Sequence, residues 1–269
     1  MQRARLGLST GSPPRPFFCG RLPVMPRYTQ SYMSFFPPFT RMVKALIITT
    51  SAVFVLTYFP YRLFGWQAPF IYLGLQPYLV VHRLYLWQLV TYLFLHGGFF
   101  HILFNMFALW MFGPDLEQMW GEAEFLKFYL LTGIGAGLFD VALTMLFGSP
   151  FSLTIGASGA IYGLLLAFGV IFPNRPIFLW FVIPIKAKWF VLIIGGIEFL
   201  SEIGGPGSNV AHLAHLGGML VAYLYLRGSG LSGRMQLQYD EWRRARLRRK
   251  FDVYMRDKER KNKPDRWLN

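Results

Sequence analysis

The chain has 269 residues, of which 54% are hydrophobic and 15% charged, and a net charge of +14. This apolar share, which includes 27 phenylalanines, exceeds that of ordinary soluble domains and indicates a membrane protein. The basic residues lie on the flanks of apolar segments, where anionic lipid is their nearest partner. We therefore expect the lipid bilayer as a partner, and no nucleic acid.

The first 43 residues form a basic segment that we predict to be disordered. Residues 1–40 contain seven prolines, five arginines and no acidic residue. We favour an extended or misassigned start, with Met25 or Met33 as the initiator. The alternative is a transit peptide, since those are also basic and poor in acidic residues. The single cysteine, Cys19, excludes an intrachain disulfide.

Six apolar segments follow, each near the roughly 20 residues that a membrane-spanning helix needs. The fifth is the weakest, because Pro184, Lys186 and Lys188 interrupt its lead-in. These segments predict an all-α membrane protein, with six transmembrane helices bundled in residues 44–227. The predicted spans are Val43–Phe64, Phe100–Phe112, Ala123–Phe147, Ser158–Phe172, Phe190–Leu200 and Ala211–Leu226.

Charge predicts the orientation of these spans. Of the 27 Lys and Arg residues, seven lie in residues 1–44 and fourteen in residues 227–269. Basic flanks stay on the cytoplasmic side, so both termini are predicted to be cytoplasmic, with residues 228–269 as a basic tail. The outer face then carries residues 65–99, 148–157 and 201–210, and the inner face carries 113–122 and 173–189.

Polar residues open the second, fourth and sixth spans. His101 and Asn105 share one face of the second span, Ser158 opens the fourth, and His215 opens the sixth. These three spans run in the same direction, so their first turns lie at the same depth near the outer surface. Polar groups are costly at membrane depth, so their coincidence indicates function. Together they supply a nucleophile, a base and two hydrogen-bond donors, which are the groups that acyl transfer requires.

Small and aromatic residues near Ser158 support this interpretation. Tyr162 lies one turn after Ser158 and can hold a histidine ring by stacking. Gly159 and Gly163 give the fourth span a small-residue face, and we expect this face to meet Gly218 and Ala222 of the sixth span. Small residues let helices approach closely, and a nucleophile and its base must lie about 2.6–3.2 Å apart.

Two histidines and two carboxylates compete for roles around the nucleophile. We favour His215 as the base because small residues lie directly below it, whereas His212 is nearer the outer loop, where water and loop carbonyls can satisfy it. Asp140 and Glu198 lie near this depth, and either could orient a histidine and complete a triad. We favour the interpretation that both face water or a loop, which leaves a Ser–His dyad.

These residues resemble the rhomboid intramembrane serine proteases. The Gly-x-Ser-Gly motif of that family corresponds to residues 156–159, and its His-x-x-x-Asn pair corresponds to His101 and Asn105. Its histidine ahead of a glycine face corresponds to His215 and Gly218. The family tyrosine, four residues after the serine, falls on Tyr162, so order and spacing agree through all six spans.

The resemblance implies a serine endopeptidase in which Ser158 attacks the scissile carbonyl and His215 takes its proton. It implies that His101, Asn105 and backbone amides around Ala157 hold the oxyanion. The substrates it implies are single-span membrane proteins, cleaved in or near the transmembrane segment, and the reaction needs neither a cofactor nor a metal. Residues 65–99 resemble the family's membrane-dipping first loop, and residues 201–210 its mobile cap.

Six spans with no added one suggest a multi-pass protein of a bacterial inner (plasma) membrane, although an organelle membrane stays open. The chain departs from the family at Gln88, where many members have arginine after Trp87, and at Ala222, where glycine is usual. Glu117 and Gly121 fit a family pattern, and we expect them to form a structural cap. Two alternatives stay open: a catalytically inactive rhomboid-like protein that binds membrane clients, and a transporter.

Overall fold

The computed structural model describes residues 37–179, 183–203 and 212–228, together with residues 244, 248, 251–256 and 258 of the tail. Most of the predicted disordered segment and of the predicted cap lies outside these residues. Helix α1 begins at Arg41, so the last residues of that N-terminal segment are helical. In the tail, residues 251–256 are helical.

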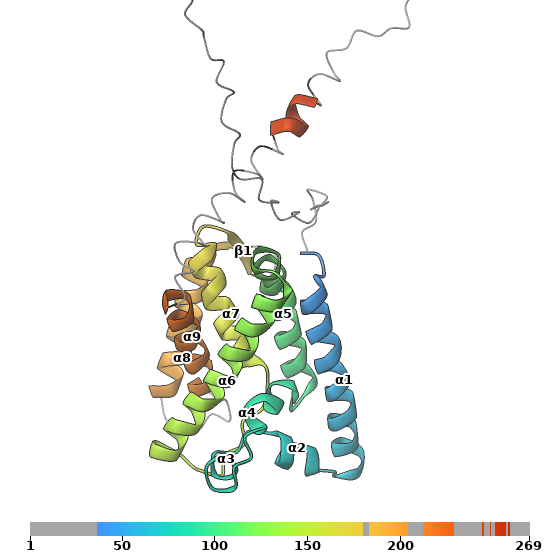
Figure 1. Ribbon diagram of the computed structural model, residues 1–269, viewed down its shortest axis with the longest axis vertical. Helices are drawn as coiled ribbons and strands as arrows, with labels where there is room; N and C mark the ends of the chain where they lie inside the picture. Colours follow the sequence, from blue (N-terminus) through green and yellow to red (C-terminus); the bar gives the residue numbers. More distant parts are fainter. Residues whose placement is uncertain are drawn as a thin grey trace, which may run out of the picture. The chain divides into compact units, whose positions relative to one another are not determined.

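Helices dominate the described part of the chain (Figure 1). Helices α1, α5 and α6 are long and apolar enough to cross a membrane, whereas α7, α8 and α9 have 14, 17 and 17 residues. The predicted helical class is confirmed, while the count of six spans and the orientation of the termini stay predictions. The main helices are α1 (Arg41–Phe64), α5 (Phe99–Trp120), α6 (Glu122–Phe147), α7 (Ser158–Ile171), α8 (Ala187–Ile203) and α9 (His212–Gly228).

The predicted inner loop at residues 113–122 is wrong. Helix α5 continues to Trp120 with Pro114 inside it, and Gly121, at a φ of 85°, separates α5 from α6. The predicted span ended at Phe112, and the Gly-Pro pair that follows it lies inside the helix although proline removes one backbone hydrogen bond. Gly113 instead serves packing: a Cβ there would lie 2.6 Å from Cγ2 of Val43, so glycine lets α5 approach α1.

Glu117 of α5 caps the N-terminal end of α1. Its buried carboxylate accepts hydrogen bonds from the backbone N–H of Met42 at 2.9 Å and of Val43 at 2.8 Å, and from the hydroxyl of Thr40. The first N–H groups of a helix lack partners within the helix, and negative charge is favourable at this end. The structural cap expected for Glu117 is therefore confirmed.

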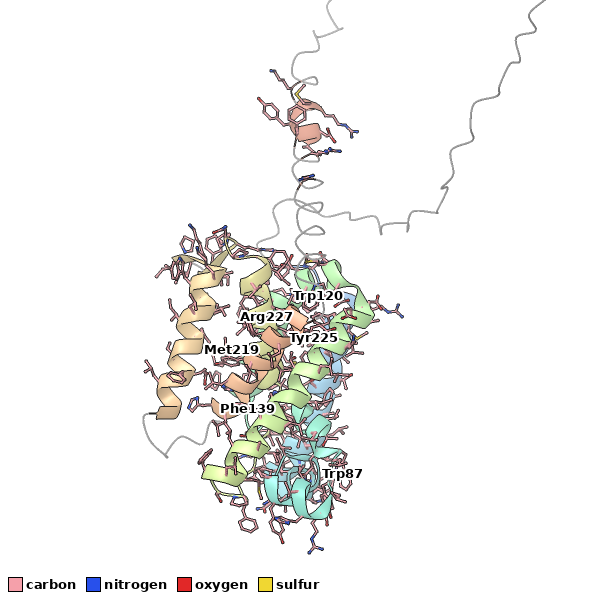
Figure 2. All side chains as sticks on the ribbon, turned by 60° about the vertical axis from the view of Figure 1, so that its left-hand side comes forward. Trp87, Trp120, Phe139, Met219, Tyr225 and Arg227 are labelled. Carbon is pink, nitrogen blue, oxygen red and sulfur yellow. The ribbon has the colours of Figure 1, made fainter. Side chains whose placement is uncertain are left out.

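Short helices fill the connection between α1 and α5. They lie at one end of the main helices (Figure 1), and Figure 2 shows Trp87 at this end and Trp120 at the other. The fully buried amide of Gln88 joins two turns of this connection, accepting from Gln76 N at 3.1 Å and donating to Ile71 O at 3.1 Å. An arginine could only donate. The elements are α2 (Ala68–Leu73), α3 (Pro77–Arg83), α4 (Gln88–Thr91) and η1 (Tyr92–Phe94).

A two-stranded antiparallel hairpin connects α7 to α8, within the predicted inner loop. Its strands are β1 (Pro176–Leu179) and β2 (Ile183–Lys186). Pro184 and Lys186, expected to interrupt the fifth span, belong to β2, and α8 starts directly after them. Just before β1, Arg175 Nη1 lies 2.6 Å from Asp115 Oδ2 and ties this connection to α5.

Helices α7 and α9 touch through glycine backbone. A Cβ added to Gly218 would lie 2.0 Å from the carbonyl oxygen of Gly159, so only glycine fits there without a shift. The expected contact between the small faces is confirmed for this pair. It is wrong for Gly163, since a Cβ there would meet Cβ of Thr132 on α6 at 2.8 Å. The small residues of α7 therefore serve two neighbouring helices.

We predict that Gly218→Ala lowers both the melting temperature and the activity. The added methyl group must push α9 away from backbone atoms of α7, and such overpacking costs typically about 1–3 kcal/mol. Thermal unfolding in detergent, measured beside substrate cleavage, tests this. Gly196→Ala is the matched control, because a Cβ at that helical glycine of α8 meets nothing within 4 Å. A Gly218→Ala protein as stable and active as the control would contradict the close packing.

Candidate active site

Ser158 is the first residue of α7, and the connection with the short helices holds the loop before it. The backbone N–H of Gly156 donates to Tyr92 O at 2.9 Å, and Leu75 and Thr154 exchange two backbone hydrogen bonds of 2.9 Å. Ala157, at the N-cap of α7, provides no side-chain cap. The first N–H groups of α7 therefore receive no hydrogen bond from the side chain at the N-cap.

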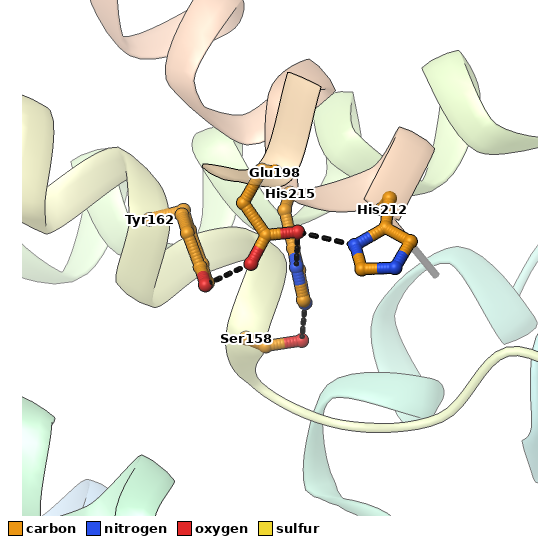
Figure 3. A network of polar contacts seen from close by, with 5 residues as sticks. All are labelled: Ser158, Tyr162, Glu198, His212 and His215. Atoms are coloured by element: carbon orange, nitrogen blue, oxygen red, sulfur yellow. Dashed lines mark hydrogen bonds and ion pairs between the residues drawn. The ribbon is translucent and has the colours of Figure 1, made fainter. Parts of the chain in front are cut away.

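His215 contacts Ser158 directly (Figure 3). Its Nε2 atom lies 2.7 Å from Ser158 Oγ, within the range that proton transfer requires. The imidazole stacks on the ring of Tyr162, with centroids 4.2 Å apart and planes 9° from parallel. The predicted proximity of serine and histidine and the predicted stacking of Tyr162 are both present in the structure, and His215, not His212, is the histidine at the serine.

Glu198 of α8 lies beside this pair, contrary to the expectation that it faces water or a loop. Glu198 is only 7% exposed. Its Oε2 lies 3.0 Å from Nδ1 of His215 and 2.5 Å from Nδ1 of His212. Its Oε1 accepts a hydrogen bond from the hydroxyl of Tyr162. Nδ1 of His215 thus lies within reach of the carboxylate without making an aligned hydrogen bond to it.

Asp140 and His212 have other partners than His215. Asp140 is buried and accepts a hydrogen bond from the hydroxyl of Thr154 at 2.9 Å, so it anchors the loop that precedes Ser158. The expectation that it serves a loop is confirmed. His212 was expected to bond with water or loop carbonyls, whereas its Nδ1 pairs with the carboxylate of Glu198.

His101 and Asn105 lie on α5 against the loop of the nucleophile. A Cβ at Gly156, whose φ is 120°, would lie 2.7 Å from His101 Nε2 and 3.8 Å from Asn105 Nδ2. The side-chain nitrogen of Asn105 is buried and has no hydrogen-bond partner among the described residues. An unpaired buried donor is costly, so its place near the loop that precedes Ser158 makes it a candidate functional group.

His96 precedes α5 and is fully buried. Its ring packs edge-on against that of His101, with centroids 4.8 Å apart. Because His96 lies before α5, this contact helps to orient the His101 ring from a residue outside that helix.

The arrangement suits acyl transfer. A serine hydroxyl at the start of a helix contacts a histidine, that histidine lies beside a carboxylate, and two side-chain donors lie against the loop that precedes the serine. Among the residues that the structure describes, Glu198, His212 and His215 also form a cluster whose nitrogen and oxygen atoms could hold a metal ion.

A rhomboid domain matches residues 83–229. The chain belongs to the rhomboid family. Rhomboid protein 1, mitochondrial, of Saccharomyces cerevisiae is 30% identical over 201 residues, which are 70% of this chain and 55% of that protein. Rhomboid protease GluP of Bacillus subtilis is 35% identical over 54% of this chain and 26% of its own length. RHOMBOID-like protein 1 of Arabidopsis thaliana is 33% identical over 54% of this chain and 35% of its own.

The chain thus matches between about a quarter and about half of the length of these three rhomboid relatives. Family and apolar helices together identify an integral membrane protein. The relatives include a mitochondrial protein, a bacterial one and a plant one, so they do not support the expected bacterial inner membrane over other membranes.

Proposed function

We propose that this rhomboid protein is an intramembrane serine endopeptidase that hydrolyses peptide bonds in or near the transmembrane segment of membrane-protein substrates. The 2.7 Å contact between His215 Nε2 and Ser158 Oγ carries the proposal. A rhomboid-like protein that only binds clients has no need of this contact. Membership in a family whose relatives include a named protease supports the same conclusion.

In this mechanism Ser158 Oγ attacks the scissile carbonyl while His215 Nε2 takes its proton. The oxygen of the tetrahedral intermediate then develops negative charge. The side chains of His101 and Asn105 and the first N–H groups of α7 stabilise that charge. His215 returns the proton to the leaving amine, and water, activated by the same histidine, releases the acyl group from Ser158.

Glu198 acts as a positioning residue in this proposal. When Nε2 of His215 accepts the proton of the serine, Nδ1 carries the other ring proton, and Nδ1 lies 3.0 Å from the carboxylate. The carboxylate favours this tautomer and stabilises the imidazolium that forms, as a triad carboxylate does. The site then works as a Ser–His pair with a supporting glutamate, rather than as the bare dyad expected from the sequence.

The substrates in this proposal are single-span membrane proteins. Ser158 and His101 are only partly buried among the described residues, as groups that act on a substrate need to be. Both residues lie in first turns of apolar helices of a membrane protein. An extended segment of a substrate at that depth would present its backbone carbonyl to the serine.

We predict that Ser158→Ala abolishes cleavage and leaves the protein folded, because the change removes the nucleophile and little volume. The measurement is cleavage of a single-span test substrate in proteoliposomes. Fluorophosphonate labelling provides a second readout, since only an activated serine reacts. Cleavage by Ser158→Ala at a rate comparable to wild type would exclude Ser158 as the nucleophile.

We predict that Asn105→Ala and His101→Ala each lower kcat without lowering the melting temperature much. Loss of one oxyanion donor costs on the order of 10²–10³ in rate. The side-chain N–H group of Asn105 has no hydrogen-bond partner among the described residues, so its removal leaves no acceptor unpaired there. Asn105→Asp, which keeps the shape but not the donor, should be as slow as the alanine variant. Wild-type turnover in all three variants would make these residues structural.

We predict that Glu198→Gln lowers kcat by on the order of 10²–10⁴, as loss of a triad carboxylate does, with little change in KM. Glu198→Asp should recover part of the rate. Glu117→Gln is the control, because it removes a buried, hydrogen-bonded carboxylate that caps α1. It should lower the melting temperature but not kcat. Equal effects of the two variants on stability and kcat would give Glu198 a purely structural role.

A further inference from the structure

Glu198, His212 and His215 bring three metal-ligating atoms together beside Ser158 (Figure 3). One ligand atom of each residue lies within 4.8 Å of those of the other two, and Nδ1 of each histidine lies within 3.0 Å of Oε2 of the glutamate. The histidines are three residues apart on α9, so one helix face presents both. Two histidines and a glutamate are a common ligand set for Zn²⁺, which prefers four ligands and completes them with water.

The burial of these atoms also favours a metal. The side chains of Glu198, His212 and His215 are only 10%, 11% and 9% exposed. Nδ1 of His215 is buried and lacks an aligned hydrogen-bond partner among the described residues, although the carboxylate is close. Coordination of a metal through that nitrogen would therefore displace no existing straight hydrogen bond of the described residues.

The fit requires the ligands to move, since their atoms are spread over as much as 4.8 Å. With bonds of about 2.0–2.1 Å, tetrahedral ligands lie about 3.3–3.4 Å apart. The separations from Oε2 are 2.5 Å to His212 and 3.0 Å to His215, so the carboxylate must draw back slightly. Rotation of the Glu198 side chain can supply this movement. The hydrogen bond from the Tyr162 hydroxyl to Oε1 would then orient the ligating carboxylate, as outer-shell partners of metals commonly do.

We propose that Glu198, His212 and His215 form a Zn²⁺ site that inactivates the enzyme when it is loaded. The inactivation rests on the proposed function, whereas the binding does not. Zn²⁺ needs the lone pair of Nδ1 of His215, so the ring proton must move to Nε2. His215 stays neutral overall, but Nε2 now donates to Ser158 instead of accepting its proton. The metal thus holds the base in the wrong tautomer and also takes away the carboxylate that supports it.

Equilibrium binding of Zn²⁺ tests the site without any need for proteolysis. The protein is the full chain carrying Ser158→Ala, in detergent, stripped of metal and titrated in competition with a fluorescent zinc chelator. We expect one Zn²⁺ per chain. We expect His212→Gln and Glu198→Gln, each added to this background, to weaken binding more than about tenfold. Glutamine at 212 still donates a hydrogen bond to Glu198, and unfolding temperatures show whether both variants are folded.

His82→Gln is the control for adventitious binding, because His82 is exposed and lies outside the cluster. It should bind Zn²⁺ as the parent protein does. No stoichiometric binding, or equal binding by the His212→Gln and Glu198→Gln variants, would overturn the site.

Activity then tests the inactivation separately. Wild-type cleavage should fall as the site fills and return when a chelator removes the metal, whereas His212→Gln should cleave at a measurable rate and resist Zn²⁺. Cleavage that persists at full occupancy would overturn the inactivation while leaving the site in place. A wild-type protein that never cleaves would instead refute the proposed function, and with it the inactivation, while the binding measurement still decides the metal site.

Discussion

The contact between the backbones of Gly159 and Gly218 is the constraint on which the candidate site depends. Ser158 and His215 lie on different helices and touch only because α7 and α9 approach to the point where no Cβ fits between them. Each of these glycines lies within three residues of the polar side chain that it brings into place. Packing at this point thus sets the 2.7 Å separation of serine and histidine more directly than their own hydrogen bond does. In a close-packed interior, one methyl group is enough to disturb such a distance.

The polar residues around this contact have two sources of support. On one side, Tyr92 and Leu75 of the connection between α1 and α5 fix the loop that leads to Ser158 through backbone hydrogen bonds. On the other side, the carboxylate of Glu198 joins side chains of α7 and α9 to α8. A single carboxylate that serves a tyrosine and two histidines is well satisfied in an apolar environment, which explains how an acidic residue is tolerated there.

Much of the fold was readable from the sequence where one apolar run coincides with one helix. The predicted spans Val43–Phe64 and Ala123–Phe147 match α1 and α6 within about two residues at each end, as such runs allow. The end of α5 was missed because a Gly-Pro pair can be accommodated inside a helix when its neighbour packs on the glycine. The hairpin before α8 was missed because its alternation is too short to separate from a polar loop.

The candidate site was predictable to a different degree for each residue. Ser158 and His215 stood out because motif and depth agree, and their contact follows once the helices are parallel neighbours. Glu198 was misjudged because its role depends on the rotation of α8 about its own axis. That rotation is set by packing against α7 and α9, and nothing in the local sequence of an almost uniformly apolar helix specifies it. The same holds for Gly163, because the spacing of small residues alone does not predict which helix packs against it.

The N-cap of α7 has a thermodynamic consequence. Ala157 occupies a position where serine, threonine, asparagine or aspartate would stabilise a helix by typically about 1 kcal/mol. In the proposed mechanism, a capping side chain there would bind the N–H groups that stabilise the oxygen of the tetrahedral intermediate. By that mechanism the helix lacks a cap in its resting state and gains one while the intermediate is bound, so some folding stability is exchanged for turnover. Stabilising this protein by improving that cap would then work against the proposed chemistry.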